Sequence, residues 1–172
     1  MAPRPSPQAA QFAERVRHTG PFDAGTPVPP APALLVARRH RATLSGAIHA
    51  LELALAAPAA DPEWRESVSI RLHSLRLAFT EHIVLTEGSD GLYAELLDHA
   101  PRLARTVYLL TREHTAIAAT LSHLQCGLGS SELSIEELRD WAGDLLRELA
   151  RHRQRGADLV YEAYETDIGG ET

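Results

Sequence analysis

Four histidines are the residues of this sequence best suited to chemistry, because each lies on the apolar face of a different predicted helix. They are His40, His82, His114 and His152. In the segment 101–125, for example, His114 lies between Leu110 and Ile117 at the spacing of one helical face. A single such imidazole is more often a core histidine hydrogen-bonded to a neighbouring helix than a metal ligand. Recurrence on all four helices favours a shared metal site.

The helices that must position these histidines are predicted from apolar residues that recur every three or four positions. They cover residues 33–57, 62–87, 101–125 and 134–164, with one or two further turns at 92–99. Asp61 is a good N-cap before Pro62, and Ser134 with Glu137 forms a capping box. Short turns make consecutive helices antiparallel neighbours, so the sequence predicts an all-α, up-down-up-down four-helix bundle.

The same spacing predicts which side of each helix faces the core and how deep each histidine lies. Val36 and Trp141 are expected on inward faces. His152 is about six residues, or roughly 9 Å, further from its turn than His114 is. The long loop or an extended fourth helix must absorb this difference if the two histidines share one site.

Carboxylates decide which metal such a site would hold. Histidines alone suit zinc or copper, whereas a pair of irons in a helical bundle is held together by bridging Glu or Asp. Glu87 follows His82 by five residues, about 140° around an ideal helix, so it shares that face only if the helix end is distorted or unwound. Asp158 lies six residues after the fourth-helix histidine, and Glu113 directly precedes the third-helix one. Each of these acids is otherwise a solvated surface charge.

Composition and charge exclude several classes of protein. A chain of 172 residues with 44% hydrophobic residues suits one compact domain. The net charge of −6, with arginines dispersed among acids, argues against nucleic acid as a partner. The single cysteine, Cys126, excludes an internal disulfide framework and a cysteine zinc cluster. Because no apolar run reaches the roughly 20 residues that span a bilayer and no signal peptide is recognisable, we expect a cytoplasmic protein without membrane contact.

The N-terminal segment differs from the rest of the chain. Residues 1–32 hold eight of the eleven prolines, which excludes regular helix or central strand over most of this length. Phe12 and Val16 are one turn apart in a stretch that could form a short helix, so the segment is either an arm that docks on the domain or a disordered tail. The predicted organisation is an arm at 1–32, a bundle at 33–167 and a tail at 168–172.

A family resemblance covers most of the chain. The run EHIVLTEGSDGLYAELLDHAPRLARTVYLLTREHTAI, preceded by ARRHRATL and followed by LRELARHRQRGADLVYEAYETDIGG, resembles the hemerythrin-like, or HHE cation-binding, domain over residues 33–167. The resemblance implies a four-helix bundle that holds a non-heme diiron centre through His and carboxylate side chains. Dioxygen is the usual small ligand of such a centre. The four histidines on the predicted helices match the family's histidines by position.

The sequence departs from the family's pattern at three places. The family usually has Glu four residues after the second-helix histidine, where this chain has Thr86 followed by Glu87. A second family histidine on the third helix corresponds to Ala118. On the last helix, glycine and alanine occupy the positions of the family's Asp or Glu, and Asp158 comes next. A π-bulge in each helix would bring both carboxylates back; otherwise the site has fewer ligands and open metal positions, which suit reactivity with O₂ or peroxide.

The expected function is a non-heme, diiron protein that handles dioxygen, peroxide or NO. It would act as a sensor or as an oxidase, oxygenase or peroxidase-like enzyme on a small-molecule substrate. The expected ligands of the two irons are His40, His82, Glu87, His114, His152 and Asp158. Gly156, at a ligand position of the family, either leaves space for a substrate or permits close helix approach. The alternative is a degenerate, metal-free bundle that serves as an interaction module.

Overall fold

The computed structural model describes residues 32–165, and this part of the chain is entirely helical, without a strand. The four long helices are α2 (Pro32–Ala56), α3 (Trp64–Glu87), α5 (Ala104–Gly129) and α6 (Ile135–Glu165). Two short elements, α4 (Leu92–His99) and the 3-10 helix η1 (Pro101–Leu103), lie between α3 and α5. The all-α class is therefore confirmed. The predicted N-terminal arm, with Phe12 and Val16, and the C-terminal tail lie outside the described residues, apart from Pro32.

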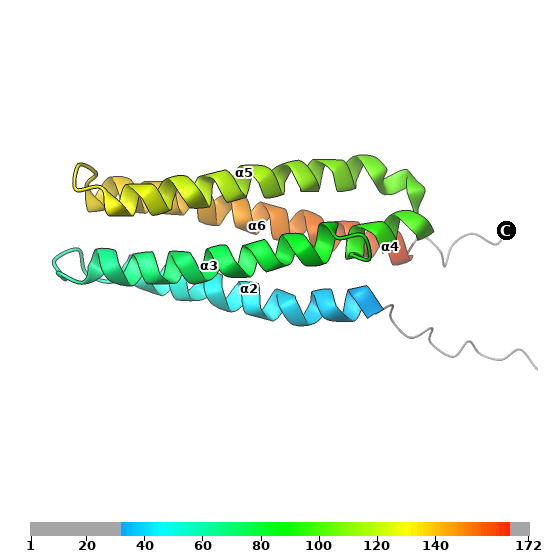
Figure 1. Ribbon diagram of the computed structural model, residues 1–172, viewed down its shortest axis with the longest axis horizontal. Helices are drawn as coiled ribbons and strands as arrows, with labels where there is room; N and C mark the ends of the chain where they lie inside the picture. Colours follow the sequence, from blue (N-terminus) through cyan, green and yellow to red (C-terminus); the bar gives the residue numbers. More distant parts are fainter. Residues whose placement is uncertain (1–31, 166–172) are drawn as a thin grey trace, which may run out of the picture. The chain divides into compact units, whose positions relative to one another are not determined.

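The long helices lie side by side, with α2 packed on α3, α3 on α5, and α5 on α6 (Figure 1). The short helix α4 contacts α3, α2 and α6, so it covers one end of this arrangement. No helix within residues 32–165 combines the length and apolar character that crossing a bilayer requires.

Of the two helix starts that the sequence predicts, one is confirmed and the other is wrong. The capping box is confirmed: the Glu137 N–H donates to Ser134 Oγ at 3.1 Å, and Glu137 Oε2 accepts from the Ser134 N–H at 2.8 Å. Glu137 Oε2 also accepts from the Ser134 hydroxyl at 2.8 Å, and the two hydrogen bonds to this carboxylate lower the pKa of Glu137. The predicted start at Pro62 is wrong, because α3 begins at Trp64. Asp61 still acts before the helix, since its Oδ1 accepts the Glu63 N–H at 2.9 Å.

The position at which α5 ends explains how His114 and His152 can lie at the same level of the bundle. This helix does not end near residue 125 but continues to Gly129, so His114 lies fifteen residues before its end, and His152 lies seventeen residues after the start of α6. Gly127 makes the extension compatible with a tight connection, because a Cβ there would lie 3.0 Å from Leu133 Cδ1. The two histidines are thus nearly level, which removes most of the predicted 9 Å offset.

The core consists of two apolar clusters. The larger lies among α2, α3, α5 and α6 and includes Leu51, Leu72, Phe79, Ile117, Leu145 and Leu149. The smaller lies among α4, η1, the start of α5 and the end of α6, and includes Leu96, Leu103, Leu110 and Leu159. Along α5, His114 falls between Leu110 of one cluster and Ile117 of the other. The histidines therefore separate the two clusters.

Two residues predicted on inward faces are exposed. Val36 is 46% exposed and lines a shallow surface hollow with Val84. Trp141 is 43% exposed, because Leu138, Ala142 and Leu145 take the buried positions of α6 and leave the indole on the flank.

Candidate metal centre

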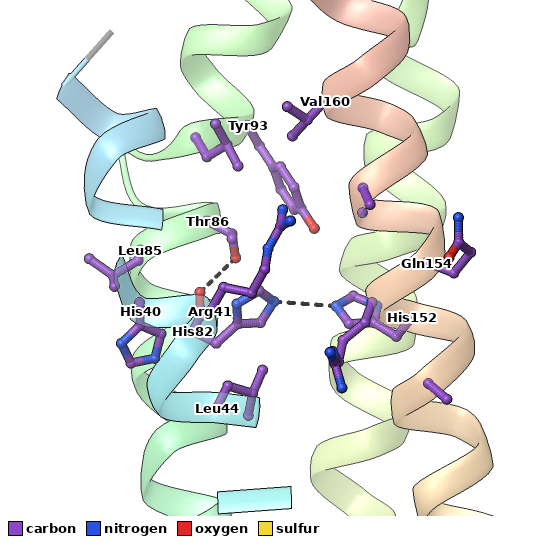
Figure 2. Close-up of a pocket in the computed structure, with 15 residues that line it drawn as sticks. His40, Arg41, Leu44, His82, Leu85, Thr86, Tyr93, His152, Gln154 and Val160 are labelled. Carbon is purple, nitrogen blue, oxygen red and sulfur yellow. Dashed lines mark hydrogen bonds between the residues drawn. The ribbon is translucent and has the colours of Figure 1, made fainter. Parts of the chain in front are cut away.

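Three histidines from three helices converge at the junction of the two apolar clusters. His82 comes from α3, His114 from α5 and His152 from α6. His114 Nε2 lies 3.0 Å from His152 Nε2. His82 Nε2 lies 3.3 Å from the same His152 atom (Figure 2). One potential ligand atom from each of the three lies within 4.8 Å of the others, and among residues 32–165 no fourth residue joins this group. Three imidazoles thus point their Nε2 atoms at one place.

Aromatic rings pack against the three imidazoles. The Phe79 ring centroid lies 5.8 Å from that of His82, 5.7 Å from that of His114 and 6.2 Å from that of His152. Tyr93 of α4 stacks on His114 at 5.9 Å with an interplanar angle of 9°. His114 and His152 are buried. Burial penalises the protonated imidazole and lowers the pKa of His82 and His114 to about 3, with nearby histidines contributing, and that of His152 to about 4.

Two carboxylates hold the outer nitrogens of two of these histidines. His114 Nδ1 donates to Glu87 Oε1 at 2.5 Å, and His152 Nδ1 donates to Glu113 Oε2 at 3.0 Å. Arg155 in turn donates to Glu113. A carboxylate can only accept, so each Nδ1 carries the hydrogen, and the neutral imidazole keeps a bare lone pair on Nε2. Carboxylates on the outer nitrogens of metal-binding histidines play this orienting role.

The unpaired lone pairs on these Nε2 atoms favour binding of a cation. His114 Nε2 and His152 Nε2 are both bare acceptors, they lie 3.0 Å apart, and their low pKa values leave them unprotonated near neutral pH. His82 Nε2 can donate to only one of them. An unpaired acceptor in a buried site is unfavourable, and a metal ion among the three nitrogens would satisfy all of them. The donor set of three imidazole nitrogens therefore fits one divalent transition-metal ion.

The other predicted ligands lie away from this convergence. His40 Nε2 donates to the Ala78 carbonyl at 3.1 Å, and its Nδ1 faces Glu81 at 3.5 Å, so His40 ties α2 to α3. Asp158 is exposed on α6 and accepts a hydrogen bond from Gln154 at 2.8 Å. The structure does not bring either residue together with the three histidines.

Glu87 reaches the site in a way that the sequence does not predict. α3 is regular through its last turn and α6 is regular as well, so neither helix contains the π-bulge that would turn Glu87 or Asp158 inward. Thr86 is buried, and its hydroxyl donates to the His82 carbonyl at 2.8 Å. Glu87 instead crosses to His114 on α5 with its side chain 30% exposed. Burial raises its pKa. The carboxylate thus lies on the outside of an imidazole and not at the Nε2 atoms.

These positions bear on the two-iron centre that the family resemblance implies. A pair of irons needs a carboxylate that bridges the two ions. Glu87 and Glu113 are both engaged at Nδ1 atoms, and neither belongs to the group of converging ligand atoms. The described residues thus fit a single ion and, in this arrangement, supply no bridge for a second.

A cavity of about 380 Å³ opens beside His82 and His152. It lies among α2, α3, α4 and α6, and Thr86 and Tyr93 line it as well (Figure 2). Gly156 lines the cavity too, and no atom lies within 4 Å of the position that its Cβ would take. Of the two explanations for Gly156, space for a small molecule therefore agrees with the structure and close helix approach does not.

Sequence reasoning missed two residues of the site. The sequence predicts only a short helical stretch around Tyr93, and nothing in that stretch shows that α4 folds back over His114. Glu113 was interpreted as a surface charge, yet its side chain is 23% exposed and contacts His152. Its position next to His114 was the available signal, because α5 and α6 are neighbours and a residue beside one ligand can reach the next helix.

Comparisons of the chain with protein-family models, with curated proteins and with solved structures found no match. The resemblance of residues 33–167 to hemerythrin-like domains therefore stays a prediction. The function has to be argued from the side chains themselves.

Proposed function

We propose that this protein is an up-down-up-down, hemerythrin-like bundle that binds one divalent transition-metal ion and handles a small ligand there. His82, His114 and His152 would hold the ion through Nε2. Iron is the metal that the family resemblance favours, and three imidazoles also suit zinc or copper. Dioxygen, peroxide or NO would be the ligand, and the protein would act as a sensor or as an oxidase of a small molecule.

The observation that carries the proposal is the approach of His114 Nε2 to His152 Nε2 at 3.0 Å while a carboxylate holds each Nδ1. Two bare lone pairs at this distance in a buried place are difficult to explain as a packing arrangement. A core histidine that serves only packing would direct one nitrogen to a backbone carbonyl, as His40 does.

The residues around the ion would have separate roles. When bound, the ion would supply Lewis-acid or redox chemistry for the small ligand. Glu87 and Glu113 hold the imidazoles in the tautomer that binds metal. Phe79 and Tyr93 exclude water, and Thr86 leaves space on the cavity side where the family has Glu.

Two alternatives to the single-ion site can be distinguished by measurement. In the two-iron centre, Glu87 or Glu113 would have to leave its imidazole and bridge the metals. In the metal-free interaction module, the three histidines would form only a buried hydrogen-bonded cluster. The cavity beside the histidines supports a role on a small molecule over the interaction module.

The test is the metal content of the full chain purified from cells grown with iron, compared with His82→Ala, His114→Ala and His152→Ala. Each of these variants is expected to lose most of the metal. His49→Ala and His73→Ala are matched controls, because both side chains are exposed. One ion per chain supports the proposal, and two ions support the diiron alternative. Metal-free wild-type protein that also fails to take up iron, zinc or copper would overturn the proposal.

A further inference from the structure

We infer that the cavity beside His82 and His152 binds a small organic carboxylate, with the carboxylate at Arg41 and Arg153 and an apolar body against the leucines of the wall. The inference deepens the proposed function, on which it rests for the role of the neighbouring histidines. It names the class of small molecule that would be presented to them.

The charges of the cavity favour an anion. Arg41 of α2 (Figure 2) and Arg153 of α6 both line it, together with the histidines, and within residues 32–165 no Asp or Glu does. A cavity with two guanidinium groups and no carboxylate is an attractive place for a negatively charged ligand.

Both arginines are available to a ligand, unlike Arg139 and Arg155 of α6. Among the described residues, neither Arg41 nor Arg153 forms an ion pair or a side-chain hydrogen bond. By contrast, Arg155 donates to Glu113, and Arg139 donates to the Leu55 carbonyl at 3.1 Å. Guanidinium groups pair with carboxylates through two parallel hydrogen bonds, so two free ones at one cavity match the head of such a ligand.

The walls and the size of the cavity favour an apolar body on that carboxylate. The apolar lining residues are Leu44, Leu85, Leu92, Ala150, Ala157 and Val160. The volume of about 380 Å³ falls within the roughly 300–1,000 Å³ of typical small-molecule sites. Gly156 adds open space on the α6 side, because nothing lies within 4 Å of its Cβ position. Inorganic anions would leave these apolar walls without a partner.

Hexanoate is a suitable probe, and isothermal titration calorimetry on the full chain measures its binding. The titration is run on metal-loaded and on chelator-treated protein, since a carboxylate also binds to metals directly. We expect Arg41→Gln and Arg153→Gln to weaken hexanoate binding about tenfold each in both metal states. Arg151→Gln is the matched control on α6, because Arg151 lines a separate hollow with Glu113 and Glu148. Hexanol is expected to bind more weakly than hexanoate in the wild-type protein.

A further variant distinguishes ligand binding in the cavity from metal binding by the histidines. Gly156→Leu should abolish hexanoate binding by filling the cavity and leave the metal content unchanged. Metal binding without any hexanoate binding, or equal affinity in the two cavity-arginine variants and in Arg151→Gln, would overturn the inference and leave the proposed function intact. Hexanoate binding that depends on both arginines in a chain that takes up no metal would support the inference while the proposed function fails.

Discussion

At the scale of single residues, the four inward histidines differ in what their nitrogens contact. The two nitrogens of His40 face the Ala78 carbonyl and Glu81, so this side chain has no nitrogen left for a shared site. His114 and His152 instead give only Nδ1 to a carboxylate and keep Nε2 free. Equal positions on apolar stripes thus lead to two different roles, a link between helices and a candidate metal ligand.

The first residue-scale prediction concerns Glu87. Glu87→Gln should lower metal affinity about 10- to 100-fold, because a neutral amide fixes the His114 tautomer less firmly than a carboxylate. Competition with a chelator of known affinity measures the change. Asp158→Asn is the control and should leave affinity unchanged, since Asp158 is exposed and bonded to Gln154. Equal affinities in the two variants would rule out an orienting role for Glu87.

The second residue-scale prediction is that His40, unlike the other three inward histidines, contributes to stability and not to metal binding. His40→Ala should keep the metal content of the wild-type protein while the free energy of unfolding falls by about 1–2 kcal/mol, because a buried hydrogen bond to α3 is lost. Metal analysis and urea unfolding of the same sample provide the two readouts. Loss of metal as large as that in His114→Ala would make His40 a ligand after all.

At the scale of elements, the turn between α3 and α4 determines how Tyr93 comes to lie over the site. The turn is tight at Gly91, where a Cβ would lie 2.8 Å from the Thr86 carbonyl oxygen and 2.9 Å from the Gly88 backbone. These neighbours are backbone atoms and cannot turn aside as a flexible side chain could. Glycine at this position therefore lets α4 return toward α3 directly after Glu87.

The element-scale prediction follows from this contact. Gly91→Ala should lower the free energy of unfolding by about 1–3 kcal/mol and weaken metal binding as well, because Glu87 and Tyr93 flank the turn. Gly129→Ala is the matched control, since nothing lies within 4 Å of its Cβ position at the end of α5. Chemical denaturation and metal titration of both variants test this. A stability loss at Gly129 equal to that at Gly91 would contradict the steric explanation.

At the scale of the whole described domain, the histidine cluster interrupts what would otherwise be one continuous core. Apolar clusters on both sides bury it, and burial is the main cause of the low pKa values of His82, His114 and His152. Stability and protonation are therefore linked. The folded metal-free protein keeps the three imidazoles neutral, whereas the unfolded chain protonates them near the ordinary value of 6.5.

The whole-molecule prediction is a loss of stability in acid for the chelator-treated protein. Between pH 6.5 and the folded-state pKa values of about 3 to 4, the unfolded chain binds more protons, so the stability that is fully present above pH 6.5 falls as pH falls. The slope should approach about 1.4 kcal/mol per pH unit for each histidine. Melting temperatures at pH 7.5, 6.0 and 5.0 measure it. The variant His114→Leu, which lacks one of these groups, should show a shallower slope; an equal slope would contradict the assignment.

The sequence alone was sufficient to predict the helices, the start of α6 and the inward faces that carry the histidines. Apolar spacing predicted the helices, because burying one stripe requires residues every three or four positions, and the capping box at Ser134 fixed the start of α6. The same spacing predicted that all four histidines would be buried, and His40, His114 and His152 are, while His82 is half-buried. Features that depend only on residues close together along one helix could therefore be predicted from the sequence.

Only the tertiary structure decided which of these side chains meet. The continuation of α5 to Gly129 set the level of His114 against His152, and the fold-back of α4 set Tyr93 on the site. Glu87 contacts a histidine of another helix from a regular turn, which spacing along α3 alone does not reveal. Contacts between helices depend on the level and rotation of each helix, and shifts of a few ångströms in either decide whether a carboxylate lies on a metal, on an imidazole or in water.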